Sequence, residues 1–145
     1  MELKEATFAA RFESLALIDA LAAEAAATAG LEAQAIYGVE MAVDEACSNI
    51  IEHAYGGETD AIIEYAHEIR CDRLIITLRD YGEPFDPTCV VQPDLNSDIG
   101  ERDIGGLGFF FMCQLMDEIN FEFSPEGGNL LTMVKYTDGE GAKEV

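Results

Sequence analysis

The chain has 145 residues, the size of one ordinary domain, and 49% of them are hydrophobic, which is enough for one core and argues against disorder. No apolar run reaches the length of a membrane span, and the N-terminus lacks the pattern of a signal peptide. We therefore expect a cytoplasmic protein with a single domain over residues 1–145, of which 137–145 form a frayed tail. The formal net charge of -21 disfavours nucleic acid and membranes as partners and suits a basic protein, although solubility alone would also explain it.

Apolar spacing predicts strands and helices through the first half of the chain. In order, they are an edge strand at 2–8, a helix that begins after Ser14 and stops at Gly30, a helix at about 32–53, and strands at 61–68 and 73–79. The short turn at 70–72 predicts that the last two strands form a hairpin.

The second half begins with an irregular stretch. Residues 81–104 include Pro84, Pro87 and Pro93, and a loop of this length inside a compact domain is usually either functional or wrongly assigned. A helix at 109–116 and a hairpin of strands at 119–123 and 130–136 are expected to follow. The joined strand pairs indicate an α+β fold, a two-layer sandwich in which helices cover one face of a mixed, mostly antiparallel sheet.

The four cysteines do not suggest a metal site. They are far apart, form no Cys-x-x-Cys pair, and have only two histidines to assist them. Buried, reduced thiols are expected at Cys47, Cys71, Cys89 and Cys113.

Two polar residues of the second helix share one face. Glu45 and Asn49 are four residues apart, roughly opposite the apolar stripe of that helix. A carboxylate can accept a proton and an amide oxygen can join a Mg²⁺ shell, so the pair is a candidate site. A solvated helix face is the plainer alternative, but asparagine is mildly unfavourable in mid-helix.

An acidic residue also follows directly on the second predicted strand of the hairpin. Asp80 precedes Gly82, so its carboxylate could accept a hydrogen bond from an exocyclic amine such as that of adenine, and the glycine would let a flat ring approach the backbone. An ordinary Asp/Gly turn would have the same sequence.

A glycine-rich run stands before the predicted helix at 109–116. Gly105-Gly106-Leu107-Gly108 would offer backbone amides and a helix N-terminus to phosphate. It lacks the Gly-Lys-Ser/Thr of a P-loop, and a flexible hinge is the competing interpretation.

In their order and separation, these segments resemble the conserved boxes of the GHKL (Bergerat-fold) ATPases, whose fold is the histidine-kinase-like ATPase domain. The closest likeness is to the anti-sigma-factor serine/threonine protein kinases, and it covers nearly the whole chain. The similar segments are Asp44-Glu45-Ala46-Cys47-Ser48-Asn49 with His53-Ala54-Tyr55, Asp80-x-Gly82 with Pro84-Phe85-Asp86, Arg102 to Gly108, Leu115-Met116-Asp117-Glu118, and Gly127-Gly128-Asn129-Leu130-Leu131-Thr132.

The resemblance implies a role for each matching residue. Glu45 would be the general base, Arg102 would reach the terminal phosphate, and Asn49 would hold Mg²⁺. Contacts to ATP are implied for Asn49, Asp80, Gly82, Phe85, Gly105, Gly106, Leu107, Gly108 and Thr132. The implied partners are a sigma factor and an antagonist protein that accepts the phosphate, and the implied assembly is a homodimer.

Other functions compete with a kinase. A binding module could hold ATP and capture a regulator without transferring phosphate, although such a module needs no base at Glu45. The catalytic domain of a histidine kinase is disfavoured because no upstream helical hairpin with a phosphoacceptor histidine is present. A ligand-free structural domain would make the ordered boxes a coincidence.

Overall fold

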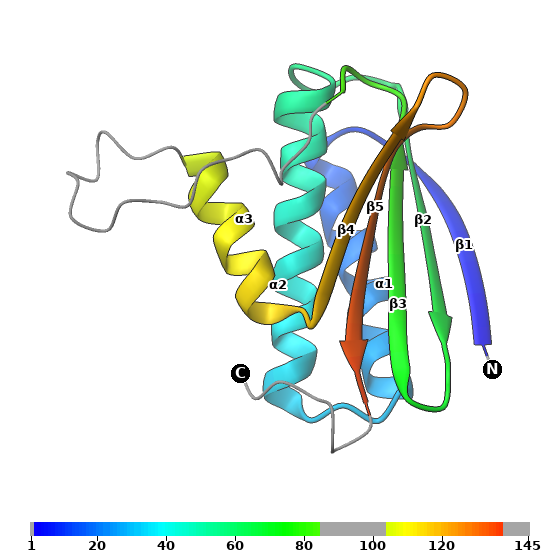
Figure 1. Ribbon diagram of the computed structural model, residues 1–145. Helices are drawn as coiled ribbons and strands as arrows, with labels where there is room; N and C mark the ends of the chain where they lie inside the picture. The colour runs from blue at the N-terminus through cyan, green and yellow to red at the C-terminus, as the bar shows by residue number, and fades with distance from the viewer. Residues whose placement is uncertain (1, 85–103, 138–145) are drawn as a thin grey trace, which may run out of the picture.

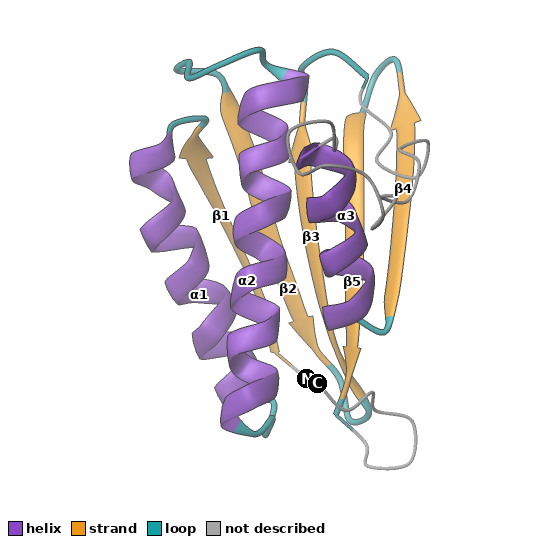
Figure 2. Ribbon diagram, turned by 90° about the vertical axis from the view of Figure 1, so that its left-hand side faces the viewer, coloured by secondary structure: helices purple, strands orange, loops and turns teal. Residues whose placement is uncertain are grey.

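The structure, a computed structural model, describes residues 2–84 and 104–137 (Figure 1). In these two stretches five strands form one sheet, and three α-helices lie against one of its faces (Figure 2). The predictions for Phe85, Cys89 and Arg102, for most of the loop at 81–104, and for the tail beyond Thr137 lie outside the described residues.

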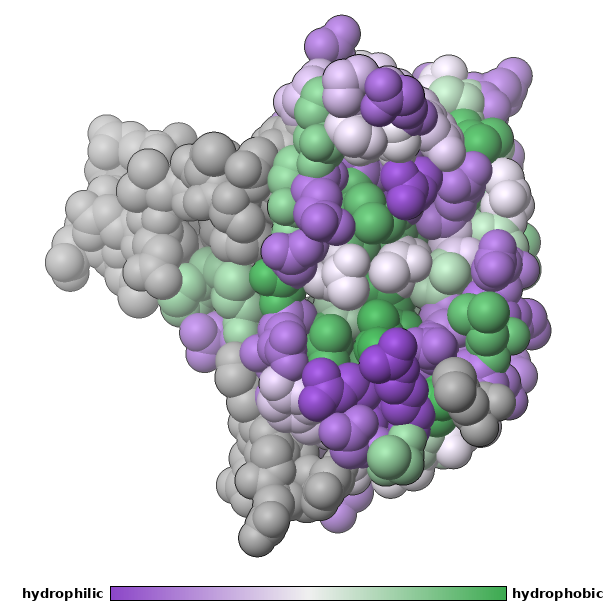
Figure 3. Space-filling model, turned by 45° about the vertical axis from the view of Figure 1, so that its right-hand side comes forward, coloured by the Kyte–Doolittle hydropathy of each residue, from purple (hydrophilic) through white to green (hydrophobic). Residues whose placement is uncertain are grey.

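The sheet confirms the predicted fold class. Its strands are β1 (Glu2–Ala9), β2 (Ile62–Ile69), β3 (Arg73–Asp80), β4 (Glu118–Ser124) and β5 (Gly128–Tyr136). They lie in the order β1-β2-β3-β5-β4, and all four pairings between the described strands are antiparallel, where a mixed but mostly antiparallel sheet was predicted. The opposite face of the sheet bears a mixture of hydrophilic and hydrophobic residues (Figure 3).

Alternation along β3 determines where its last residue points. Leu74, Ile76 and Leu78 are buried, because every second side chain faces the helices. Asp80, two residues after Leu78, lies at the end of the strand and points to the same side, so its carboxylate is buried as well. An acidic group is thus placed on the helix-covered face.

The first two helices pack closely on the sheet and on each other. They are α1 (Leu15–Thr28), preceded by a 3-10 turn at Phe12–Ser14, and α2 (Ala33–Asn49). Small side chains allow the close approach, since Ala22, Ala25 and Ala26 of α1 are almost completely buried. These buried alanines form one core with the aliphatic residues of β2 and β3.

The end of α2 departs from regular geometry. A π-helical turn at Ile50–Ala54 follows Asn49, with the Tyr55 N–H donating to the Ile50 carbonyl over 3.0 Å. Such wide turns occur often at functional sites. The turn carries the Ala54 carbonyl to the loop after β3, where it accepts a 2.7 Å hydrogen bond from the Glu83 N–H.

The third helix begins earlier than predicted. α3 covers Ile104–Leu115, so the run Gly105-Gly106-Leu107-Gly108 belongs to the helix and does not precede it. Glycine is a poor helix former, which is why the sequence suggested a later start. Packing explains the difference at Gly108, because a Cβ atom there would collide with the Glu45 side chain of α2.

Candidate functional site

A small hollow lies between α2, α3 and the sheet. Its volume is about 30 Å³, room for an ordered water but far less than the ~300–1,000 Å³ of most ligand pockets. It is lined by Ala46, Asn49, Ile50, Ala54, Asp80, Met112, Phe121, Asn129 and Leu131.

The Asp80 carboxylate is held in place from two sides. Its Oδ1 accepts hydrogen bonds from Asn129 Nδ2 at 2.8 Å and from the Gly82 N–H at 3.0 Å. Burial raises the pKa of Asp80, while these two hydrogen bonds act in the opposite direction. Oδ1 is thus occupied by protein donors, and the carboxylate is fixed at the wall of the hollow.

Asn129 is the polar partner that sequence reasoning did not single out. Its amide nitrogen donates to Asp80 and, at 3.1 Å, to the Glu83 carbonyl. Its Oδ1 is buried and has no hydrogen-bond partner among the described residues. An unsatisfied buried acceptor costs free energy, so a donor group from a ligand would be favourable here. The signal that could have indicated Asn129 in the sequence is its position directly after Gly128, in the last of the segments that resemble the family.

Glu45 and Asn49 lie one turn apart on α2, as predicted, but their face is not free in solvent. Asn49 is 6% exposed and lines the small hollow, while Glu45 contacts α3 at Gly108. Burial raises the pKa of Glu45, and the nearby charges of Glu52 and Asp44 add to this effect. A carboxylate with a raised pKa is a stronger base than an exposed one.

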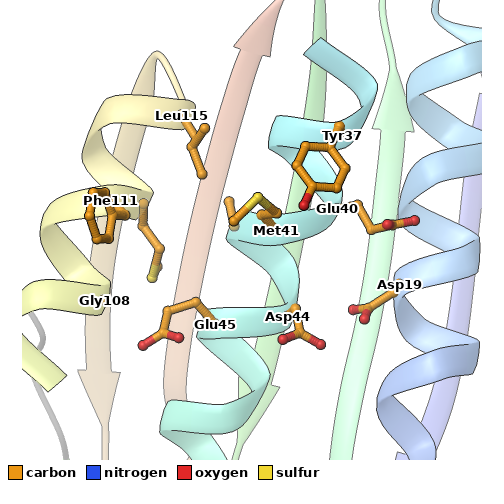
Figure 4. A pocket seen from close by; sticks show the side chains of 11 residues that line it. Asp19, Tyr37, Glu40, Met41, Asp44, Glu45, Gly108, Phe111 and Leu115 are labelled. Atoms are coloured by element: carbon orange, nitrogen blue, oxygen red, sulfur yellow. The ribbon is translucent and has the colours of Figure 1, made fainter. Parts of the chain in front are cut away.

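A larger groove adjoins Glu45. It lies between α2 and α3, reaches α1 at Asp19, and has a volume of about 270 Å³ (Figure 4). Glu45 and Gly108 line this groove, and Met112 lines both the groove and the small hollow. The two spaces are therefore neighbours, and the Glu45–Asn49 face of α2 runs from one to the other.

The family of the chain follows from comparison with known proteins. The histidine kinase-like ATPase domain matches residues 8–135, which is nearly the whole described fold. The chain belongs to this family.

Its relatives include proteins named serine-protein kinase RsbW. The RsbW of Listeria monocytogenes serovar 1/2a is 33% identical over 123 residues, covering 82% of this chain and 77% of that protein. The RsbW of Bacillus velezensis is 33% identical over 110 residues, covering 72% and 67%. The RsbW of Halalkalibacterium halodurans is 30% identical over 140 residues, covering 93% and 83%.

Within this ATPase family fold, the prediction for Thr132 needs correction. β5 alternates, and Asn129, Leu131 and Met133 point toward the helices. Thr132 is the pairing partner of Thr77 in β3, so both side chains lie on the same face of the sheet. That face is the one not covered by the helices, away from the small hollow. Asn129, not Thr132, is the polar side chain that β5 contributes to the hollow.

The two glycine segments occupy different environments. Gly82 packs so tightly on the Ala54 carbonyl that a Cβ atom would collide with it. Gly105, Gly106 and Leu107 lie in the first turn of α3, where backbone N–H groups have no partner within the helix. Gly108 lies one residue further along and faces Glu45.

Two further results concern the described residues alone. Among them, no group of three or more His, Cys, Asp or Glu side chains is arranged to hold a metal ion. Cys47, Cys71 and Cys113 form no disulfide; Cys47 is buried, as predicted, whereas Cys71 is exposed and Cys113 is only partly buried, so the prediction of burial was wrong for these two. No helix in 2–84 or 104–137 is long and apolar enough to cross a membrane.

Proposed function

We propose that the chain is an ATP- and Mg²⁺-dependent serine/threonine protein kinase of the anti-sigma-factor kind. It phosphorylates an antagonist protein and sequesters a sigma factor in the cytoplasm, acting as a homodimer without direct contact to nucleic acid. One observation carries the proposal: Glu45 and Asn49 share a face of α2 that runs between the groove and the small hollow. Membership of the histidine kinase-like ATPase family supports ATP as the phosphate donor.

In this account, the small hollow receives adenine. The exocyclic amine of adenine has two hydrogens to donate, and both Asp80 and the unsatisfied Asn129 Oδ1 are acceptors at the hollow. Because the hollow holds about 30 Å³, entry of the adenine ring requires side chains that line the hollow to move apart. Opening the hollow costs free energy, which lowers the observed affinity for ATP.

Asn49 lies between the adenine end and Glu45, where phosphates would pass. Its amide oxygen is a suitable Mg²⁺ ligand, because Mg²⁺ prefers oxygen and usually takes few protein ligands besides phosphates and water. The ion would neutralise phosphate charge, which matters in a chain with a net charge of -21. The N–H groups of Gly105, Gly106 and Leu107 at the start of α3 would add donors to phosphate oxygens, and Arg102 a positive charge.

Glu45 is the proposed general base. The substrate hydroxyl oxygen forms a bond to the γ-phosphorus, the bond to the β,γ-bridging oxygen breaks, and ADP leaves with that electron pair. The hydroxyl proton passes to the Glu45 carboxylate, whose raised pKa suits it to hold the proton. Most of the rate enhancement comes from positioning and electrostatics, as in other phosphoryl transfers.

Incubation with γ-labelled ATP, Mg²⁺ and candidate antagonist proteins tests the proposal. We expect label on a serine or threonine of one antagonist, identified by mass spectrometry. Calorimetry with ATP runs alongside it. ATP binding without transfer to any antagonist would favour the alternative, a non-catalytic module that captures a partner, and would contradict the kinase.

A further inference from the structure

The groove between α2 and α3 exposes large apolar side chains. Tyr37, Met41 and Phe111 are 62%, 45% and 51% exposed, and Leu115 lies beside them (Figure 4). Large hydrophobic residues that gather in the open usually mark an interaction surface. These four residues come from two helices, so a partner lying along the groove would contact both.

The charged side chains of the groove are all acidic. Asp19, Glu40, Asp44 and Glu45 line it, and its described lining includes no Lys, Arg or His. Asp19 Oδ1 is buried and finds no hydrogen-bond donor among the described residues. Burial raises the pKa of Asp19, and a hydrogen bond with Asp44 and the charges of Asp44 and Glu40 raise it further. A cation at this point would pair with several carboxylates and reduce their repulsion.

We propose that this groove is the docking site for a basic, amphipathic segment of the protein that is phosphorylated. Its apolar side chains would cover Tyr37, Met41 and Phe111, and its Lys or Arg side chains would pair with Asp19, Glu40 and Asp44. The inference rests on the proposed function, because Glu45, the proposed base, is one of the residues that line the groove.

Helix geometry sets the spacing that such a segment needs. Glu40 and Glu45 are five residues apart on α2, or about 7.5 Å along its axis. An extended chain covers that distance in about two residues at ~3.3 Å each. A substrate should therefore carry a Lys or Arg about two residues from the Ser or Thr that reaches Glu45.

Charge decides between this occupant and a second copy of the chain. The chain has 29 acidic and 8 basic residues, so another copy would bring mainly like charge to the carboxylates of the groove. A basic segment brings the complementary charge. The same charge relation predicts that docking weakens as salt concentration rises.

A short synthetic peptide tests the docking site without requiring catalysis. It carries one serine, an arginine two residues away, and leucines on the remaining face, and its binding is followed by fluorescence anisotropy. We expect Glu40→Lys and Phe111→Ser each to weaken peptide binding about tenfold. Glu40→Lys replaces an acidic partner of the arginine with a like charge, and Phe111→Ser removes an apolar contact for the leucines. Glu5→Lys makes the same charge change on the far side of the molecule, in β1, and should change binding less than twofold.

The possible results test the docking site and the proposed kinase activity separately. Peptide binding that is weakened equally by Glu5→Lys and Glu40→Lys would overturn the docking site and leave the kinase unaffected. A change of oligomeric state in Phe111→Ser, measured by sedimentation, with unchanged peptide binding would assign the groove to self-association and also overturn it. Groove-dependent binding without any phosphoryl transfer would support docking and contradict the kinase.

Discussion

The carboxylate of Glu45 occupies the space that a Cβ atom on residue 108 would need. This relationship links the start of α3 to the polar face of α2, and a pair of substitutions can measure it. In a helix, Gly→Ala normally stabilises by about 1 kcal/mol. Here the added methyl must displace Glu45, so Gly108→Ala should gain less than this or destabilise the wild type.

The same substitution in a Glu45→Ala background should restore the full gain of about 1 kcal/mol, because the obstacle is gone. Urea unfolding of the four proteins of this cycle gives the coupling energy between residues 45 and 108. Equal effects of Gly108→Ala in both backgrounds would mean that the two residues do not contact in solution.

Asp80→Asn should weaken ATP binding by about 1–3 kcal/mol, because it replaces a buried charged acceptor. The asparagine can still accept from Asn129 and the Gly82 N–H through one oxygen, but its NH₂ group no longer accepts from the adenine amine. Calorimetry should also show that the wild type prefers ATP to GTP, since GTP offers a carbonyl at that position. Equal affinities for the two nucleotides would exclude this role for Asp80.

The Asp19–Asp44 pair predicts a dependence of stability on pH. The pKa of Asp19 is raised to about 8 in the folded chain by burial, by the hydrogen bond with Asp44, and by the charges of Asp44 and Glu40. An unfolded Asp has a pKa of about 3.9, so the folded state holds an extra proton between about pH 4 and pH 8. The free energy of unfolding is therefore not reduced by Asp19 below about pH 4, where the carboxyl is protonated in both states. It falls as the pH rises from about 4 to about 8, because the folded state must then keep or lose a proton that the unfolded state has already released.

Asp19→Asn keeps the shape but carries no charge, so its melting temperature should exceed that of the wild type by more at pH 9 than at pH 5. Glu5→Gln, on β1 and exposed, is the matched control and should show no such trend. A difference between Asp19→Asn and wild type that is the same at both pH values would refute the raised pKa.

Much of this fold could be predicted from local pattern. Alternation in β2 and β3 and the apolar stripe of α2 depend on neighbouring residues alone. Both strands were predicted within one residue, and the helix predicted at about 32–53 covers α2 together with most of the π-helical turn that follows it. The parity of β3 also explains why Asp80 is buried next to the helices. These features needed no knowledge of distant contacts.

The remaining features depend on contacts between distant segments. α3 includes its glycines because Gly108 must lie against Glu45, which is 63 residues earlier in the chain. Asn129 reaches Asp80 only because β3 and β5 pair in one register, whereas the family resemblance had implied Thr132. The Glu45–Asn49 face is partly buried for the same reason, because α3 covers it.

The central claim is that Glu45 accepts the proton of the substrate hydroxyl, and single-turnover phosphoryl transfer by Glu45→Gln tests it most directly. Glutamine preserves the shape of the side chain, so ATP affinity and the melting temperature serve as controls and should change little. We predict that transfer to the antagonist slows by about 10²–10⁴-fold, the usual worth of a general base. Transfer at the wild-type rate, with ATP affinity unchanged, would contradict the account.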